Sequence, residues 1–129
     1  MRPAYHRAGM GSEGRVINRT RGSVVAAHCR VASTMRDRTV GLLGTGELPA
    51  GEGLWIEQSP SIHMFFMRYP IDAVFVDRHG KVVRIVERLR PWRIVAWARG
   101  ARDCLELPAG AARAAGINVG DELRLEPLG

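Results

Sequence analysis

Alternating hydrophobic and polar positions predict β structure in the first third of the sequence. Short runs rich in β-branched residues occupy residues 15–18 and 23–32, with a turn between them at Arg21–Gly22. Successive side chains of a regular strand point to opposite faces. This alternation puts His28 on the more polar face of the second run. The other face holds Val25, Ala27, Cys29 and Val31. We therefore expect a half-buried strand over residues 23–32.

The densest hydrophobic segment covers residues 63–76 and is divided by Pro70. Proline lacks the N–H that a central strand needs, so we expect a strand or bend before it and a strand over 71–77 after it. Both faces of that second strand are apolar, which is typical of a central strand covered on both sides. A turn over residues 77–80 and a returning strand over 81–89 complete a predicted hairpin.

Helical spacing favours two short helices, over residues 33–43 and 109–115, the second ended by Gly116. Further short strands are predicted over residues 54–56, 92–97, 103–107 and 121–126. In the strand over 103–107 we expect Leu105 and Leu107 to point inward. These elements together predict a mostly β (α+β) fold, a compact, barrel-like single domain with two short helices.

Length and charge suggest a basic tail ahead of this domain. The chain has 129 residues, enough for one hydrophobic core, and a formal net charge of +6. Residues 1–38 hold eight Arg and two acidic residues, whereas the remainder is balanced. Residues 1–14 show no periodicity and contain three Gly. We therefore expect a flexible tail over 1–14 and one globular domain over 15–129.

The basic residues are weak evidence for a nucleic-acid partner. Of the 19, 18 are Arg and only Lys81 is Lys, a bias that a G+C-rich genome produces without selection for binding. The first 23 residues are polar and Gly-rich, and no stretch approaches the about 20 apolar residues of a membrane-spanning helix. We expect a cytoplasmic protein without membrane contact. Cys29 and Cys104 lack metal-like spacing, so we expect two free, buried thiols.

The last part of the sequence, LELPAGAARAAGINVGDELRLE over residues 105–126, resembles the GD-box element of cradle-loop barrels, including the swapped-hairpin AbrB-type DNA-binding domains. Its pattern is a strand, a short helix, a Gly–Asp turn and a final strand. Gly120 suits a positive φ, and the Asp121 carboxylate is placed to accept backbone N–H groups across the turn. The resemblance implies a β-α-β local structure and carries little information about function.

A wider resemblance covers about four-fifths of the chain, from residue 25 to residue 126. Its most distinctive segment is IHMFFMRYPIDAVFVDRHGKVV, with RTVGLLG and GEGLWI before it and LELPAG and GINVGD after it. These segments are similar to the bacterial and archaeal family known only as domain of unknown function 192. The resemblance implies a compact, mostly β domain with one or two short helices. It implies no catalytic residue, because the family has no established biochemical role.

Four residues are candidates for a ligand site, namely His63, Phe66, Asp72 and Glu106. His63 precedes the Met- and Phe-rich stretch 64–67, which fits either an apolar ligand cleft or plain core. The four His residues show no paired spacing, and the common catalytic motifs are absent. We therefore expect neither a metal nor a cofactor.

Asp72 is unusual because it shares a strand face with Val74 and Val76. If its strand neighbours the strand over 103–107, Asp72 and Glu106 would form an acid pair suited to proton transfer. The alternative is ordinary pairing of Asp72 with Arg68 or another Arg, and exposure of Glu106 to solvent.

Three functions remain open from the sequence. The first is a non-enzymatic binding or accessory protein for an unknown small molecule or protein, with an apolar cleft near the four candidate residues. The second is nucleic-acid binding through the basic N-terminal third and the AbrB-like element. The third is a small hydrolase or isomerase that uses Asp72, Glu106 or His63.

Overall fold

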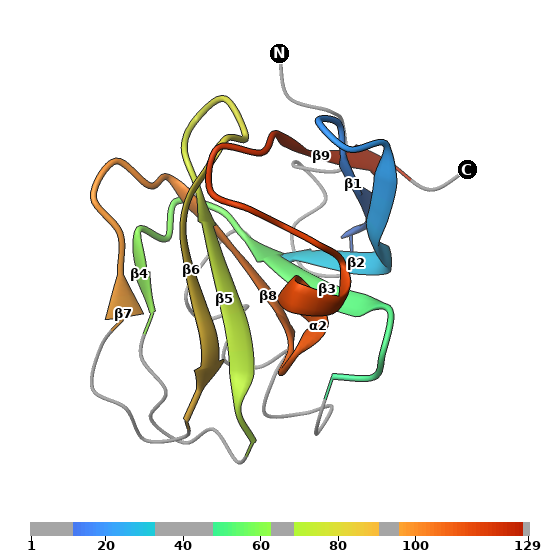
Figure 1. Cartoon of the computed structure of the whole chain (residues 1–129), viewed down its shortest axis with the longest axis horizontal. Coiled ribbons are helices and arrows are strands. Elements are labelled where there is room, and N and C mark those ends of the chain that lie inside the picture. The colour runs from blue at the N-terminus through green and yellow to red at the C-terminus, as the bar shows by residue number, and fades with distance from the viewer. Residues whose placement is uncertain (1–11, 33–47, 63–68, 91–95, 128–129) are drawn as a thin grey trace.

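The protein is built on a seven-stranded mixed sheet (Figure 1). The computed structural model describes residues 12–32, 48–62, 69–90 and 96–127. The sheet strands are β1 Ser12–Asn18, β2 Ser23–Ala32, β3 Glu52–Ile56, β5 Ile71–Val76, β6 Val82–Leu89, β8 Asp103–Pro108 and β9 Leu123–Pro127. A small second sheet pairs β4 (Ser61–Ile62) with β7 (Ala96–Trp97). The one helix among the described residues is α2, Ala111–Ala114.

The strand order in the large sheet is β6-β5-β8-β3-β2-β1-β9. The pair β2–β3 is parallel, and every other neighbouring pair is antiparallel. The predicted hairpin over 71–89 is confirmed as β5–β6, and each residue of β5 is buried. Burial on both faces follows because each face of β5 packs into a hydrophobic cluster, while β6 and β8 pair with its two edges.

The large sheet is not a closed barrel, so this part of the prediction is wrong. Its two outer strands, β6 and β9, approach each other only at one corner. An isolated bridge joins Lys81 to Glu122, and the Val82 N–H donates to the Asp121 carbonyl oxygen at 2.8 Å. Barrel closure needs a continuous ladder between first and last strands. The single bridge leaves both edges without such a ladder.

The two faces of the sheet carry separate hydrophobic clusters. The first cluster includes Ile71, Ala73 and Phe75 from β5 together with Cys104. The second holds the alternate residues of the same strand, Val74 and Val76, together with residues of β1, β2, β8 and β9. The helix α2 contacts β5 and β8 and adds the buried Ala112 to the second cluster.

Strict alternation fails in β2, where Ala26 and Cys29 are both buried while Ala27 and His28 are exposed. The register with β1 passes from Gly14–Cys29 to Val16–Ala26, so β2 has one extra residue there. A β-bulge of this kind leaves a residue unpaired and reverses the side-chain alternation beyond it. The prediction that Ala27 points inward with Cys29 is therefore wrong, whereas exposed His28 matches the prediction.

Several other boundaries differ from the predicted ones. Strand β1 begins at Ser12, three residues before the predicted start and inside the predicted tail. The helix predicted over 109–115 is reduced to the single turn of α2. The helix predicted over 33–43 lies outside the described residues, as do residues 1–11 of the tail and most of the strand predicted over 92–97. Across the described residues, no helix is long and apolar enough to span a membrane.

Candidate functional site

Asp72 lies on β5 beneath the start of α2 and is fully buried. Its Oδ1 accepts the Arg88 backbone N–H at 2.8 Å. Its Oδ2 accepts the N–H groups of Gly110 at 3.0 Å and Ala112 at 2.9 Å. Three hydrogen bonds from backbone amides offset the desolvation cost of burying a carboxylate. Asp72 therefore joins strand β6 to the turn that begins α2, in a positioning role rather than by ion pairing.

Arg88 occupies a strained backbone conformation at the end of β6. Its φ is +51°, in the left-handed region that residues with a Cβ rarely adopt. The register between β5 and β6 is irregular here, passing from Ile71–Leu89 to Ala73–Val86. Such strain costs about 1–3 kcal/mol and persists where the surroundings impose it. The hydrogen bond from the Arg88 N–H to buried Asp72 and the irregular pairing with β5 both hold the backbone at this point.

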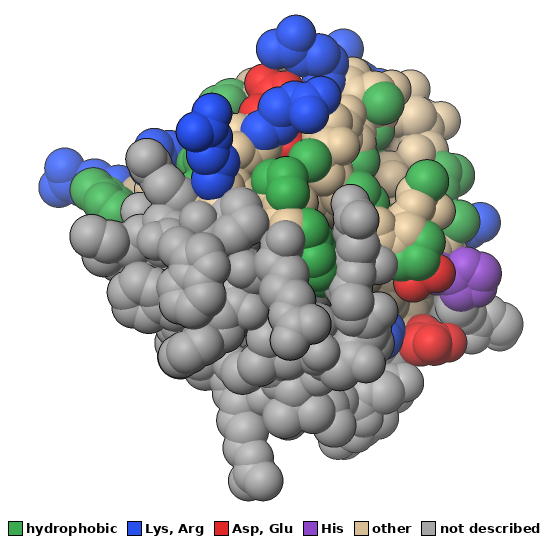
Figure 2. All heavy atoms as spheres, turned by 90° about the horizontal axis from the view of Figure 1, so that it is seen from below, with side chains coloured by type: hydrophobic (Ala, Val, Ile, Leu, Met, Phe, Trp, Pro, Cys, Tyr) green, Lys and Arg blue, Asp and Glu red, His purple; other side chains and the backbone are tan. Residues whose placement is uncertain are grey.

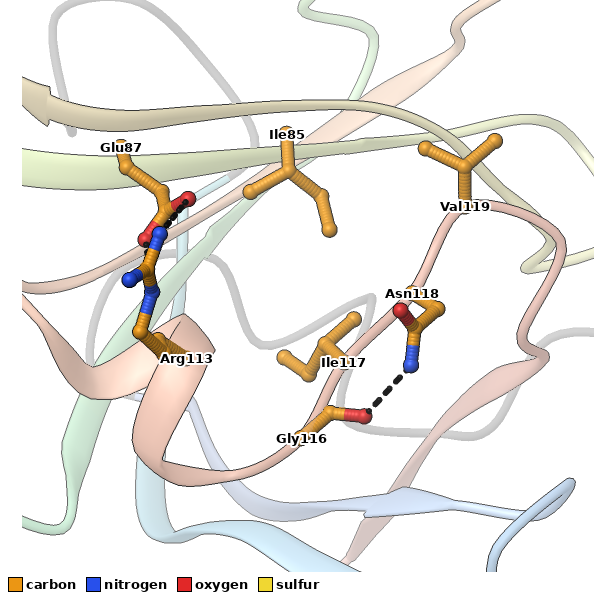
Figure 3. A pocket seen from close by; sticks show the side chains of 7 residues that line it. All are labelled: Ile85, Glu87, Arg113, Gly116, Ile117, Asn118 and Val119. Carbon is orange, nitrogen blue, oxygen red and sulfur yellow. Dashed lines mark hydrogen bonds and ion pairs between the residues drawn. The ribbon is translucent and has the colours of Figure 1, made fainter.

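A shallow groove runs between β6 and the segment that contains α2 and residues 116–119 (Figure 3). One part, of about 380 Å³, is lined by Ile85, Glu87, Arg113, Gly116, Ile117, Asn118 and Val119. The other, of about 400 Å³, is lined by Glu87, Arg88, Gly110, Arg113 and Ala114. The two parts share Glu87 and Arg113, so they adjoin. Ligand pockets typically measure about 300–1,000 Å³, which makes each part the size of a small ligand.

The two parts of the groove differ in chemistry. Figure 3 shows Ile85, Ile117 and Val119 around the space between β6 and the loop that follows α2. Glu87 and Arg113 point toward each other at the opposite end, with Arg113 Nε donating to Glu87 Oε1 at 3.2 Å. The Arg113 side chain is 81% exposed, so this ion pair contributes no more than about 1 kcal/mol. A bound group can therefore recruit Arg113 at little cost.

Arg88 brings a second guanidinium to the charged part of the groove. A Cβ placed on Gly110 would lie 3.3 Å from Arg88 Nη2, so the guanidinium passes close above this glycine. The φ of Gly110 is +91°, which also favours glycine there. Among the described residues, the ion pairs of the structure do not include Arg88. The Arg88 residue is also exposed.

Glu106 lies on the other side of the sheet from Asp72. The register pairs Asp72 with Leu107 and Ala73 with Glu106, and directly paired residues share a face. The acid-pair prediction is therefore wrong, although β5 and β8 are neighbours as it required. Exposure of Glu106 is also wrong, because its exposed fraction is 1%. Its strand lies between β5 and β3, so its neighbours Leu54 and Ala73 flank it on both sides.

The four predicted site residues do not all bear on the groove. His63 and Phe66 lie outside the described residues, as does Arg68. Asp72 supports the groove from beneath, and Glu106 is on the opposite face. Arg88 and Arg113 were not among the predicted residues, because nothing in the sequence distinguishes them from the other Arg residues of an Arg-rich chain. Gly110, just before the short helix, was a signal for this site in the sequence. A glycine has no Cβ, so another segment can approach the backbone closely there.

Another buried carboxylate, that of Asp121, organises the turn before β9. It accepts hydrogen bonds from Arg21 Nε at 2.7 Å, Asn18 Nδ2 at 2.9 Å and the Asn118 N–H at 2.9 Å. The hydrogen bond from Arg21 is the main reason that the pKa of Asp121 falls to about 2. The same contact raises the pKa of Arg21. This network joins β1 to the turn before β9, and it meets the groove at Asn118, whose side chain lines the apolar part.

Both cysteines are free and buried, as predicted. Cys29 belongs to the second hydrophobic cluster and Cys104 to the first, so they lie on opposite faces of the sheet. Burial raises the pKa of the Cys29 thiol to about 12, which makes it a poor nucleophile. Within the described ranges, His, Cys, Asp and Glu side chains form no group of three or more suited to a metal ion.

The outer surface contains many basic side chains. Figure 2 shows Lys and Arg gathered along the upper part of one face, with acidic side chains between them and hydrophobic side chains below. Exposed Arg residues of β6 and α2 include Arg84, Arg88 and Arg113. Because Glu87 offsets part of this charge, the surface has mixed character rather than forming a uniform basic stripe.

Comparison with known proteins identifies the family of the chain. Residues 16–125 match the model of DUF192, described as "Uncharacterized ACR". A UPF0127 protein of Thermococcus sibiricus is 34% identical over 119 residues, covering 86% of this chain and 74% of the relative. A UPF0127 protein of Pyrococcus furiosus is 30% identical over 115 residues, covering 84% of this chain and 95% of the relative. The chain belongs to the DUF192 family, so the predicted resemblance is confirmed.

Two crystal structures share the fold. A protein of Sinorhizobium meliloti, described as "a putative transcription regulator", has a TM-score of 0.76 at 22% identity, covering 91% of this chain and 95% of that one. A protein of unknown function from Novosphingobium aromaticivorans has a TM-score of 0.72 at 23% identity, covering 96% of this chain and 98% of that one. At this identity the likeness establishes the fold alone.

Proposed function

We propose that this DUF192 protein is a small non-enzymatic binding protein whose ligand site is the groove between β6 and the α2 segment. The observation that carries the proposal is the groove itself, in which apolar and charged side chains line two adjoining parts. Ligand sites typically combine an apolar lining with a few well-placed polar groups. Asp72 supports this arrangement, because it fixes both the backbone of Arg88 and the start of α2.

The predicted alternative of a hydrolase or isomerase has less support. A general acid and a general base must reach one substrate, and Asp72 and Glu106 lie on opposite faces of the sheet. Both carboxylates are also enclosed, with exposed fractions of 0% and 1%. A hydrolase or isomerase that uses His63 stays a prediction, as does the part of the predicted ligand site near His63 and Phe66.

Nucleic-acid binding is the second candidate function. Exposed Arg side chains and the name of the Sinorhizobium meliloti protein favour it. We also infer that residues 105–126 form a GD-box, which the Asp121 contacts across the Gly120–Asp121 turn support. Binding through basic residues would weaken steeply as salt rises. Undetectable binding to duplex and single-stranded DNA and RNA at low salt would exclude this candidate.

The cytoplasmic location stays a prediction.

The groove proposal is tested by thermal unfolding against a panel of metabolites and fragments. We compare the wild type with Val119→Asp, which puts a charge on the apolar part of the groove. Val119 is 63% exposed, so this variant is expected to fold. Val24→Asp is the matched control, because Val24 is 52% exposed on β2 and does not line the groove.

Compounds of the panel should raise the Tm of the wild type and of Val24→Asp, and the increase should be lost in Val119→Asp. The physical reason is that a ligand that binds only the folded state stabilises it by mass action. A panel without any stabilising compound would contradict the proposal. So would stabilisation that persists in Val119→Asp.

A further inference from the structure

We propose that the ligand of this groove is a small amphiphilic carboxylate. Its carboxylate group binds the Arg88 guanidinium, and its hydrocarbon part lies against Ile85, Ile117 and Val119. The inference rests on the proposed binding function and adds the chemical class of the ligand.

The positioning of Arg88 is the first observation behind this proposal. A strained residue held by its surroundings is a mark of functional sites, and the φ of Arg88 is +51°. Buried Asp72 accepts the Arg88 N–H, so the backbone from which the side chain extends is fixed. Gly110 leaves room for the guanidinium to pass, at 3.3 Å from the position of a Cβ. Arginine binds carboxylates through two parallel hydrogen bonds, and a fixed backbone reduces the entropy lost on binding.

The charge of the groove indicates the charge of the ligand. Three side chains contribute, namely Arg88 and Arg113 with one positive charge each and Glu87 with one negative charge. The sum of +1 matches a monoanion. A dianionic phosphate would leave an excess negative charge beside Glu87, which repels it. A carboxylate is therefore the better match than a phosphate group.

The apolar part of the groove accounts for the rest of the ligand. Ile85, Ile117 and Val119 surround it (Figure 3), and Val119 is 63% exposed. A hydrocarbon group that covers Val119 removes apolar surface from water, which favours binding. The volume of about 380 Å³ limits this group to a short chain or a single ring.

The proposal is tested by titrating the full chain with hexanoate while following amide signals by NMR. Hexanol has the same chain without the charge, acetate has the charge without the chain, and inorganic phosphate represents the competing anion. Arg88→Gln removes the guanidinium but keeps the backbone N–H that binds Asp72. Arg90→Gln is the matched control, because Arg90 is exposed two residues further on and does not line the groove. The Tm of each variant verifies folding.

Hexanoate should bind at least about tenfold more tightly than hexanol, acetate or phosphate, because both ends of the ligand contribute. Arg88→Gln should weaken hexanoate at least about tenfold, and Arg90→Gln by less than about twofold. Equal binding of hexanol and hexanoate, tighter binding of phosphate, or an unchanged Kd in Arg88→Gln would overturn the carboxylate proposal.

The outcomes separate this inference from the proposed function. Suppose that panel compounds stabilise the wild type and not Val119→Asp, while hexanoate binds no more tightly than hexanol, acetate or phosphate. Only the ligand class is then wrong. If neither the panel compounds nor hexanoate affect the groove residues, the binding function and the ligand class both fail.

Discussion

Asp72 is a buried carboxylate in a strand whose other side chains are hydrophobic. Its position in the sequence already marked it as unusual, because a carboxylate next to Val74 and Val76 requires partners. The partners could not be predicted, because they are backbone amides of residues 88, 110 and 112, far along the chain. The sequence left two alternatives open, an acid pair with Glu106 and pairing with Arg68 or another Arg. In the structure the Asp72 carboxylate instead accepts backbone N–H groups from the end of β6 and from the start of α2, which fixes both segments.

Replacing Asp72 by Asn should lower the free energy of unfolding by about 2–3 kcal/mol. The Asn oxygen can accept the Gly110 and Ala112 N–H groups, but its amide group then faces the Arg88 N–H, and two donors meet. Urea unfolding followed by circular dichroism gives the difference.

The control for this change is Asp77→Asn. Asp77 Oδ1 alone accepts the N–H groups of His79 and Lys81 in an exposed turn, and an Asn oxygen can replace it. Its effect should stay below about 1 kcal/mol. Equal stability of Asp72→Asn and the wild type would contradict the role given to the Asp72 carboxylate.

At the scale of elements, regular strands were predicted well and irregular ones were not. The hairpin β5–β6 and the strand β8 follow from their hydrophobic patterns and flanking turns. The bulges in β2 and near Arg88 have no signal in the sequence, because one extra residue depends on the partner strand. The groove lies beside one of these bulges. Its location therefore could not be derived from periodicity.

The turn before β9 gives a prediction on pH dependence. Asp121 has a pKa of about 2 in the folded state, against about 3.9 for an unperturbed Asp. Its folded pKa is the lower one, so its contribution to stability is fully present above about pH 4. It is lost as the pH falls toward 2, because the unfolded state takes up the proton first.

The Asp121→Asn variant should therefore lose stability at pH 7 but show a shallower decrease between pH 4 and 2 than the wild type. The variant lacks the titrating group, whereas the other carboxylates still titrate. Urea unfolding at a series of pH values measures both slopes. Parallel curves for the two proteins would show that the contacts of Arg21 and Asn18 with Asp121 do not contribute as described.

At the scale of the whole molecule, the mostly β class and the family were predicted correctly, whereas the predicted barrel was wrong because the sheet is open. Closure depends on whether β6 and β9 form a ladder, and only one bridge joins Lys81 to Glu122. The side on which each carboxylate points also depends on register. Asp72 and Glu106 belong to neighbouring strands, as anticipated, yet their register places them on opposite faces. This arrangement favours a supporting role for Asp72 and separates it from Glu106.

We place the ligand site between β6 and α2 rather than on the face of the sheet that holds Glu106. Mapping amide shifts on adding hexanoate tests this location most directly. We predict the largest changes at Ile85, Glu87, Arg113 and Val119, with little change at Leu54 and Ala73, which flank Glu106. The largest changes at Leu54 and Ala73, or no change at the groove residues with either hexanoate or the panel compounds that raise the Tm, would contradict this location.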